Sequence, residues 1–202
     1  TQFATSDGLR KVNSIYDTNA NRHIIAYTND DQSRKAYLFS AATSGTSVTV
    51  SSAVLCPSSD VKHSSDDTFG LYFDASTNRN IAVFPMNSVN FIYIYSFSCN
   101  TSTGALTVNG TYTQGPALQN SDRGVTAAYE PITERGVFIY LDNSNSLVNA
   151  AFLTTSGSSN TITISNVVTV RPYNSGNSSL TLSTFDTTAG NMQYGFRQDN
   201  NG

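Results

Sequence analysis

Four carboxylates recur in this 202-residue sequence at nearly constant intervals, and carboxylates can hydrolyse glycosides or bind calcium. They follow one another at steps of 57, 56 and 56 residues and are Asp17, Asp74, Glu130 and Asp186. Glycoside hydrolysis needs two carboxyl groups about 5 to 10 Å apart across a shared cavity. Calcium loops place oxygen ligands at alternate positions, as the segments DTNAN at 17–21 and DASTN at 74–78 do. The residues around the four carboxylates indicate whether these acids serve in catalysis or metal binding, or only close turns of the backbone.

Those surroundings repeat as well. An aromatic residue precedes each carboxylate, and another follows ten positions after it in all four copies. The residues five positions after the carboxylates are Arg22, Arg79, Arg135 and Asn191. Two apolar runs thus flank a short polar turn, which predicts a β-hairpin whose acidic side chain accepts hydrogen bonds from nearby backbone N–H groups. We therefore interpret the four acids and three arginines as structural turn residues. The glycine and distal glutamate of a calcium loop are absent, so we predict no metal site and no catalytic residue.

Each hairpin leads into two more strands. A second polar turn, a third apolar run, a Ser/Gly turn and a fourth run follow, with Val, Ile, Tyr, Phe and Thr dominating throughout. The fold class expected is all-β: four-stranded antiparallel blades repeated about every 56 residues, which form a β-propeller or part of one. The chain is then one repeat array over 1–202. Its parts are unit 1 with a leading joint (1–67), unit 2 (68–122), unit 3 (123–178) and a partial unit 4 (179–202). We expect further units beyond Gly202, or a second copy, to complete the ring.

Bulk composition excludes several classes of partner. A net charge of −3 and a pI of about 5.1 provide no basic surface for nucleic acid, and no apolar run is long enough for membrane insertion. Cys56 and Cys99 are expected at opposite ends of their sheets, so we predict no disulfide. The sequons at Asn100, Asn109 and Asn177 carry glycans only if a eukaryotic secretory pathway makes the protein.

The remaining candidate residues have simple structural interpretations. His23 and His63 are the only histidines, too few and too far apart in the sequence to indicate a zinc site, and no cofactor is expected. The arginines are expected to pack over an aromatic ring or pair with the turn acid, with contact to an acidic glycan as the alternative. Tyr93 and Tyr95 alternate with isoleucines and read as core. They become a ligand contact, by stacking on a sugar, only if their strand faces solvent.

Several segments carry a resemblance to a known family. IYDTNANRHIIAY, TNDDQSRKAYLF and SGTSVTVSSAVL in unit 1, with AAYEPITERGVFIY and SGSSNTITISNVV in unit 3, resemble the β-propeller-type repeat of marine bacteriophage tail-fibre and other virion-surface proteins. Unit 2 departs from that pattern at PMNSVN and STGALTVNG, and the family's glycine-containing third strand is absent.

The resemblance implies a non-enzymatic structural or host-recognition component of a virion surface appendage, such as a phage tail fibre. Its location would be the virion or the extracellular space, and its partners other virion proteins, copies of itself or a host surface glycan. The alternative is a secreted or cell-surface β-propeller protein that binds carbohydrate or forms filaments. A propeller glycosidase is a third hypothesis, and it requires two close carboxylates in a channel.

Overall fold

The computed structural model describes residues 9–29, 34–59, 61, 68–86, 92–112, 121–142, 145–156, 160–172 and 178–198. These residues form fifteen β-strands, and none of them belongs to a helix that is long and apolar enough to cross a bilayer. The prediction of an all-β chain is confirmed. Its cause is local, because β-branched and aromatic side chains fill the strands while Asp, Asn, Ser and Gly fill the turns.

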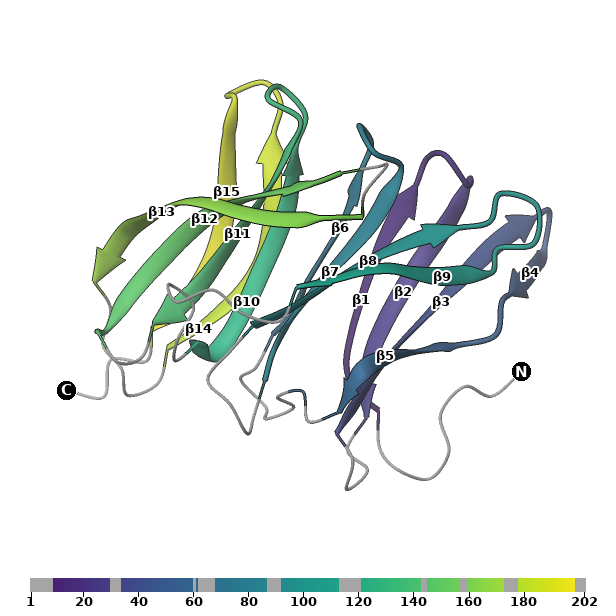
Figure 1. Ribbon diagram of the computed structural model, residues 1–202, viewed down its shortest axis with the longest axis horizontal. Coiled ribbons are helices and arrows are strands. Elements are labelled where there is room, and N and C mark those ends of the chain that lie inside the picture. The colour runs from purple at the N-terminus through teal and green to yellow at the C-terminus, as the bar shows by residue number, and fades with distance from the viewer. Residues whose placement is uncertain are drawn as a thin grey trace.

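The strands form four antiparallel sheets in chain order (Figure 1). The first sheet contains β1 (Leu9–Asp17), β2 (Arg22–Asn29), β3 (Lys35–Ser44) and β4 (Ser47–Val50), with β5 (Val54–Ser59) also paired to β3. The second contains β6 (Gly70–Asp74), β7 (Arg79–Pro85), β8 (Ile92–Cys99) and β9 (Leu106–Tyr112). The third contains β10 (Ser121–Glu130), β11 (Arg135–Asp142), β12 (Leu147–Thr155) and β13 (Ile162–Pro172). The fourth contains β14 (Ser178–Asp186) and β15 (Asn191–Gln198). Repeated four-stranded sheets are thus confirmed, and the described strands do not close into a ring.

The fourth strand of the first sheet differs from the sequence expectation. The fourth apolar run of unit 1, VTVSSAVL at 48–55, does not form one continuous strand, because the chain leaves the ladder after Val50 and returns to β3 at Val54. Ser51 explains the break, because its hydroxyl accepts a hydrogen bond from the Ser40 N–H at 2.9 Å. A side-chain acceptor thereby stands where a strand carbonyl would, and the backbone is free to bend.

Successive sheets are joined by hydrogen bonds in or just before their first strands. The Val125 N–H donates to the Thr68 carbonyl at 3.1 Å, and the Thr68 hydroxyl donates to the Val125 carbonyl at 3.2 Å. The Thr126 hydroxyl donates to the Ser183 hydroxyl at 2.8 Å. Each of these pairs is 57 residues apart, one more than the 56-residue step between these units, so each contact is offset by one position in the repeat. Figure 1 shows the result as sheets arrayed side by side from the N-terminal to the C-terminal end.

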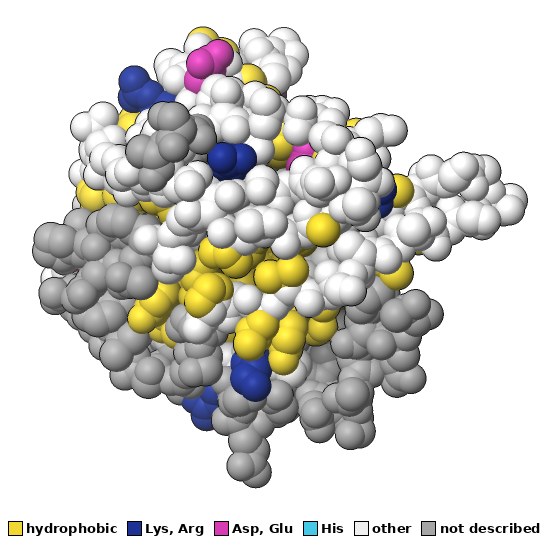
Figure 2. Space-filling model, turned by 45° about the vertical axis from the view of Figure 1, so that its right-hand side comes forward, with side chains coloured by type: hydrophobic (Ala, Val, Ile, Leu, Met, Phe, Trp, Pro, Cys, Tyr) yellow, Lys and Arg dark blue, Asp and Glu magenta, His cyan; other side chains and the backbone are white. Residues whose placement is uncertain are grey.

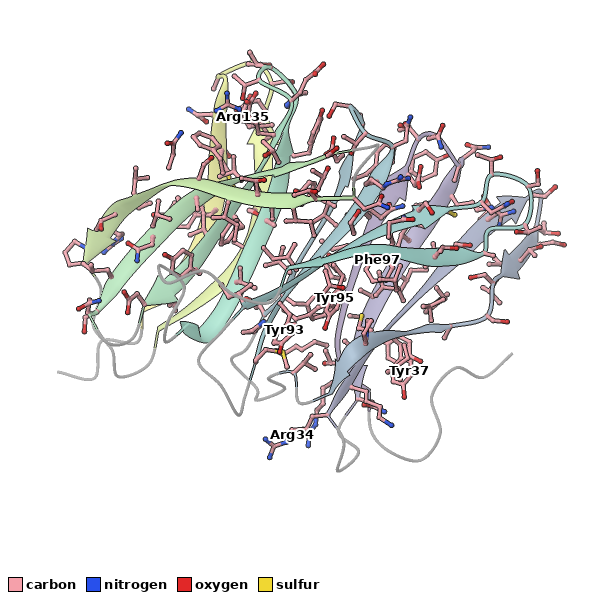
Figure 3. The ribbon with its side chains drawn as sticks, in the orientation of Figure 1. Arg34, Tyr37, Tyr93, Tyr95, Phe97 and Arg135 are labelled. Carbon is pink, nitrogen blue, oxygen red and sulfur yellow. The ribbon has the colours of Figure 1, made fainter. Side chains whose placement is uncertain are left out.

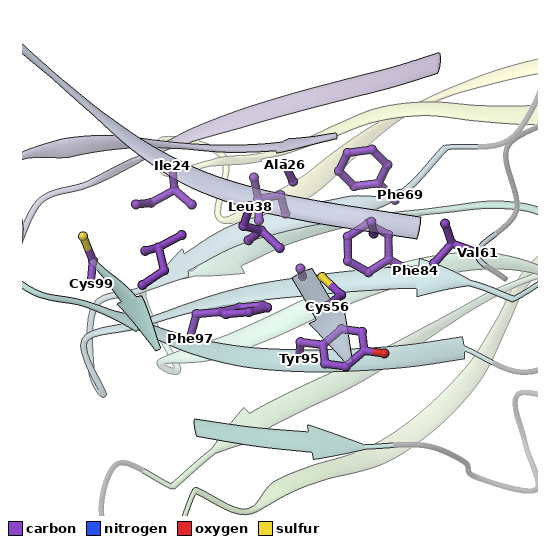
Figure 4. Close-up of a cluster of buried hydrophobic side chains, with 14 of the residues drawn as sticks. Ile24, Ala26, Leu38, Cys56, Val61, Phe69, Phe84, Tyr95, Phe97 and Cys99 are labelled. Carbon is purple, nitrogen blue, oxygen red and sulfur yellow. The ribbon is translucent and has the colours of Figure 1, made fainter. Parts of the chain in front are cut away.

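The second sheet is covered on both faces. Phe84 and Tyr95 pack toward the first sheet, in a cluster with Ile24 and Leu38 (Figure 4). Neighbouring positions on the same strands point the other way and pack against the third sheet; they are Ile81, Val83, Ile92 and Ile94. Every residue from Asn80 to Pro85 is buried as a consequence. Most buried hydrophobic side chains belong to the clusters at these two interfaces. Fully burying one such side chain stabilises the fold by about 1.5–3 kcal/mol.

The first and third units leave more apolar surface in solvent than the second. Every large hydrophobic side chain that is exposed in the described residues belongs to one of these two units. They are Val12, Tyr16, Val48, Leu55, Ile132, Val167, Val168 and Val170. On the face shown in Figure 2, charged side chains are few and hydrophobic ones gather in the middle.

Two glycines at equivalent turns provide a test of the sheet-to-sheet fit. Gly45 and Gly104 lie in the third hairpins of the first and second sheets, with φ of +59° and +75°. A Cβ on Gly45 would meet nothing within 4 Å, whereas one on Gly104 would lie 2.5 Å from the Ser40 Oγ and 2.6 Å from the Arg22 Nη1. Both alanine variants bear the left-handed backbone cost of about 1–2 kcal/mol. Gly104→Ala adds an overpacking cost of about 1–3 kcal/mol, measurable as a larger loss of unfolding free energy in urea. Equal losses for the two variants would contradict the close approach.

Candidate functional site

The four recurrent carboxylates close their own turns. Each lies at the end of the first strand of its sheet and accepts a hydrogen bond from a backbone N–H two or three residues later. The donors are Ala20 to Asp17 (2.8 Å), Ser76 to Asp74 (3.0 Å), Ile132 to Glu130 (2.5 Å) and Thr188 to Asp186 (2.9 Å). This is the Asx-turn geometry, and in Glu130 its longer-chain counterpart.

Two of the carboxylates also connect neighbouring sheets. The Asn80 side-chain amide donates to the Asp17 Oδ2 at 2.8 Å, and the Thr155 hydroxyl donates to the Asp74 Oδ2 at 2.5 Å. Both acids are almost fully buried, at 1 % and 2 % exposed, so these are charge-assisted bonds inside the protein. The sequence contains no local pattern that predicts this second role.

The fourth residue after each acid adopts the left-handed backbone. Its φ is 55° at Asn21, 54° at Asn78, 55° at Glu134 and 66° at Gly190. Three of the four are Asn or Gly, the residues that tolerate this conformation best. The Asn or Gly four positions after the acid, at Asn21, Asn78 and Gly190, is the sequence signal that indicates this backbone conformation.

The arginines after the turns lie between sheets or over an aromatic ring. The Arg22 Nη2 donates to the Ser102 carbonyl at 3.3 Å, and the Arg79 Nη2 donates to the Asn160 Oδ1 at 3.4 Å. These acceptors are 80 and 81 residues away, in the third hairpin of the next sheet. Arg135 instead places its guanidinium 5.3 Å from the centre of the Phe152 ring in its own sheet (Figure 3).

Tyr95 lies in the core, as its alternation with isoleucines predicted, and the condition for a ligand contact at this residue is not met. It is 0 % exposed and packs beside Phe97, which leaves no ring surface on which a sugar could stack (Figure 3). Tyr93 is half-buried and stacks on Tyr95, with ring centres 6.2 Å apart. The alternation that suggested an aromatic surface arises because the aromatic face of β8 packs against the first sheet.

The other sequence candidates are distributed over the molecule. Asn100 is exposed and its Oδ1 accepts the Ser102 N–H at 3.0 Å, while Asn109 is half-buried. Asn177 and His63 lie outside the described residues, and His23 is exposed beside Tyr16.

The two cysteines, Cys56 and Cys99, are free and buried, and burial raises the pKa of both thiols. Across the described part of the chain, no group of three or more His, Cys, Asp or Glu side chains could hold a metal ion.

A hollow lies along the first strands of the four sheets. Side chains alternate along a strand, so the aromatic residue before each acid points away from it. All four of these aromatics line one hollow of about 490 Å³, which we call the aromatic hollow; they are Tyr16, Phe73, Tyr129 and Phe185. The residues after the acids, Thr18, Ala75, Pro131 and Thr187, line it too.

A second hollow, of about 480 Å³, continues along the same strands. It shares Ile15, Leu71, Ala127, Ser183 and Thr184 with the aromatic hollow and adds Asn13, Ser14, Thr126, Gln193, Tyr194 and Gly195. None of the described side chains that line either hollow is charged. The pair therefore offers aromatic rings, hydroxyls and amides, with no carboxylate, imidazole or ammonium for proton transfer.

Comparison with known proteins assigns the chain to no family. No family model matches the sequence, and no curated protein matches it either. The architecture is established: the protein is all-β and has several four-stranded antiparallel sheets.

Glu130 makes a pH-dependent contribution to stability. Burial acts to raise the pKa of this carboxyl, but hydrogen bonds from the Thr133 side chain, the Thr133 and Ile132 N–H groups, and the charge of Arg135 together lower it below 4.5. A lowered folded-state pKa means that the ionised form stabilises the fold above pH 4.5 and that this stability is lost as the pH falls through the folded pKa. We expect Glu130→Gln to be less stable than the wild type at pH 7, with the difference shrinking as the pH falls below 4.5. Urea unfolding at a series of pH values measures it, and a difference that grows in acid would contradict the assignment.

Proposed function

We propose that the chain forms an arc of a β-propeller and serves as a non-enzymatic structural or host-recognition component of a virion surface appendage, such as a phage tail fibre. The observation that carries this proposal is the use made of the recurrent carboxylates. Their oxygens are engaged by turn N–H groups and, at Asp17 and Asp74, by side chains of the next sheet. Groups held in this way build an architecture and are unavailable as acid and base.

The way in which the sheets pack supports the propeller. In a propeller, four-stranded sheets are arranged radially and pack face to face, with their first strands near the centre. Here β1, β6, β10 and β14 lie next to one another in that order, and the second sheet is covered by its neighbours on both faces. The resemblance of the repeat to virion-surface proteins supports the location.

A second candidate function is a secreted or cell-surface β-propeller protein that binds carbohydrate or forms filaments. The exposed apolar side chains of β4 and β13 favour it, because Val48 is 65 % exposed and Val168 is 55 % exposed on outer strands. Apolar strands of this kind favour association with further sheets. Copies of the same chain are the partners that this alternative predicts.

Fractionation of particles from the source culture or community tests the virion assignment. We expect peptides of this chain to band with intact, nuclease-resistant particles in a density gradient, and antibody against it to label appendages in electron micrographs. Recovery only from the cell-envelope or soluble fraction would contradict the virion assignment and favour the alternative. Release of reducing sugar from any of a panel of polysaccharides, abolished by Asp17→Asn or Asp74→Asn in a folded protein, would contradict the non-enzymatic role.

A further inference from the structure

We propose that the aromatic hollow binds a neutral saccharide. This inference rests on the proposed host-recognition function and gives it a site and a ligand class. The site consists of Tyr16, Phe73, Tyr129 and Phe185, which reach one hollow from four successive sheets.

These four aromatics differ from the other aromatic set in the repeat. In the three copies whose side chain is described, the aromatic ten positions after the acid is core: Tyr27, Phe84 and Tyr140 are 4 %, 0 % and 0 % exposed. The one before each acid keeps part of its surface in solvent, from the half-buried Phe73, Tyr129 and Phe185 to Tyr16 at 44 % exposed. Both sets have the same residue types and the same period, so composition does not account for the difference. Folding alone leaves part of each ring in water, and a ligand that covers the rings gains the burial of that remaining surface.

Two of the rings are already held in place. The Tyr16 hydroxyl donates to the Asn21 Oδ1, and its ring meets the His23 ring edge-on with centres 5.0 Å apart. Tyr129 stacks on Tyr72 with centres 6.4 Å apart and planes 19° apart. Rings that are fixed before binding lose little conformational entropy when a ligand stacks on them, and this favours affinity.

The lining chemistry selects the ligand class. A pyranose has an apolar C–H face that stacks on an aromatic ring, and hydroxyls around its edge that need hydrogen-bond partners. Around the rings, the hollow provides the hydroxyls of Thr18, Ser183, Thr184 and Thr187. Its described lining holds no Lys or Arg to pair with a sialate or phosphate, and burying an unpaired charge is costly. A neutral saccharide is the ligand that these groups match.

The size and continuation of the hollow favour an oligosaccharide. Its volume of about 490 Å³ is in the range of small-ligand sites. The adjoining hollow extends along the same four strands and adds the amides of Asn13 and Gln193. We therefore expect a trisaccharide to bind more tightly than the corresponding monosaccharide.

A single tryptophan can report on binding, because the chain contains none. Phe185→Trp keeps an aromatic ring at the site and introduces the only indole fluorophore. The full-length variant is titrated with maltotriose, cellotriose, mannotriose and chitotriose, each with its monosaccharide, and with 3′-sialyllactose as the charged comparison. Calorimetry on the unmodified chain repeats each titration, so a silent fluorophore does not hide binding. We expect saturable binding of at least one neutral trisaccharide, and binding of the sialylated sugar that is weaker by about tenfold or more.

Three variants localise the binding. Tyr129→Ala removes one stacking ring and is expected to weaken binding about tenfold. Ala75→Glu adds bulk and charge at an exposed position in the lining without removing a packed side chain, and is expected to abolish binding. Tyr37→Ala is the matched control, because Tyr37 is a half-buried tyrosine outside both hollows and its loss should leave affinity unchanged. Thermal melts and near-ultraviolet circular dichroism establish that each variant is folded.

Three outcomes overturn the inference. They are no binding of any neutral saccharide by either method, binding that Ala75→Glu leaves intact, and preferential binding of 3′-sialyllactose. If the chain is found on virions yet binds no saccharide, this inference fails while the proposed function stands. If it binds a neutral saccharide at the hollow but is absent from virions, the inference stands and the virion assignment fails.

Discussion

A β-sheet that is apolar on both faces is stable only when both faces are covered, and the second sheet of this protein is such a sheet. Phe84 and Val83 are neighbours in β7, both 0 % exposed, and they pack toward opposite neighbouring sheets. A single four-stranded unit cannot satisfy this requirement by itself. Repetition solves it, because each new copy supplies the face that covers the last one.

Covering apolar faces does not by itself fix how one sheet is placed on the next, and polar contacts between neighbouring sheets provide that placement. Asp17 and Asp74 each use one oxygen for the turn and the other for the next sheet, so turn closure and sheet placement depend on one side chain. Arg22 and Arg79 make a second connection, to the third hairpin of the following sheet. These contacts position the first strands so that their aromatic residues meet at one hollow.

The repeat, the hairpins and the all-β class followed from the sequence because they depend on local spacing. Contacts between units could not be predicted from the sequence, because they depend on how whole sheets pack. Asp17 receives its inter-sheet bond from Asn80, but the equivalent position in the third unit is Gly136, which has no side chain to donate. Thr155, from a different strand, donates to Asp74 instead. Tyr95 shows the same limit, since alternation identified an aromatic face but not the sheet that covers it. The aromatic hollow could not be predicted from the sequence for the same reason. Its residues are far apart in the sequence, and each one by itself looks like the end of a strand.

A double-mutant cycle on Asp17 and Asn80 tests most directly whether the carboxylate corners are connectors between sheets. The unfolding free energies of Asp17→Ala, Asn80→Ala and the double variant are measured in urea at neutral pH. A buried hydrogen bond to an ionised carboxylate predicts a coupling energy of about 1.5–3 kcal/mol between the two residues. Strictly additive losses, with no coupling, would show that the corner closes its turn without holding the next sheet.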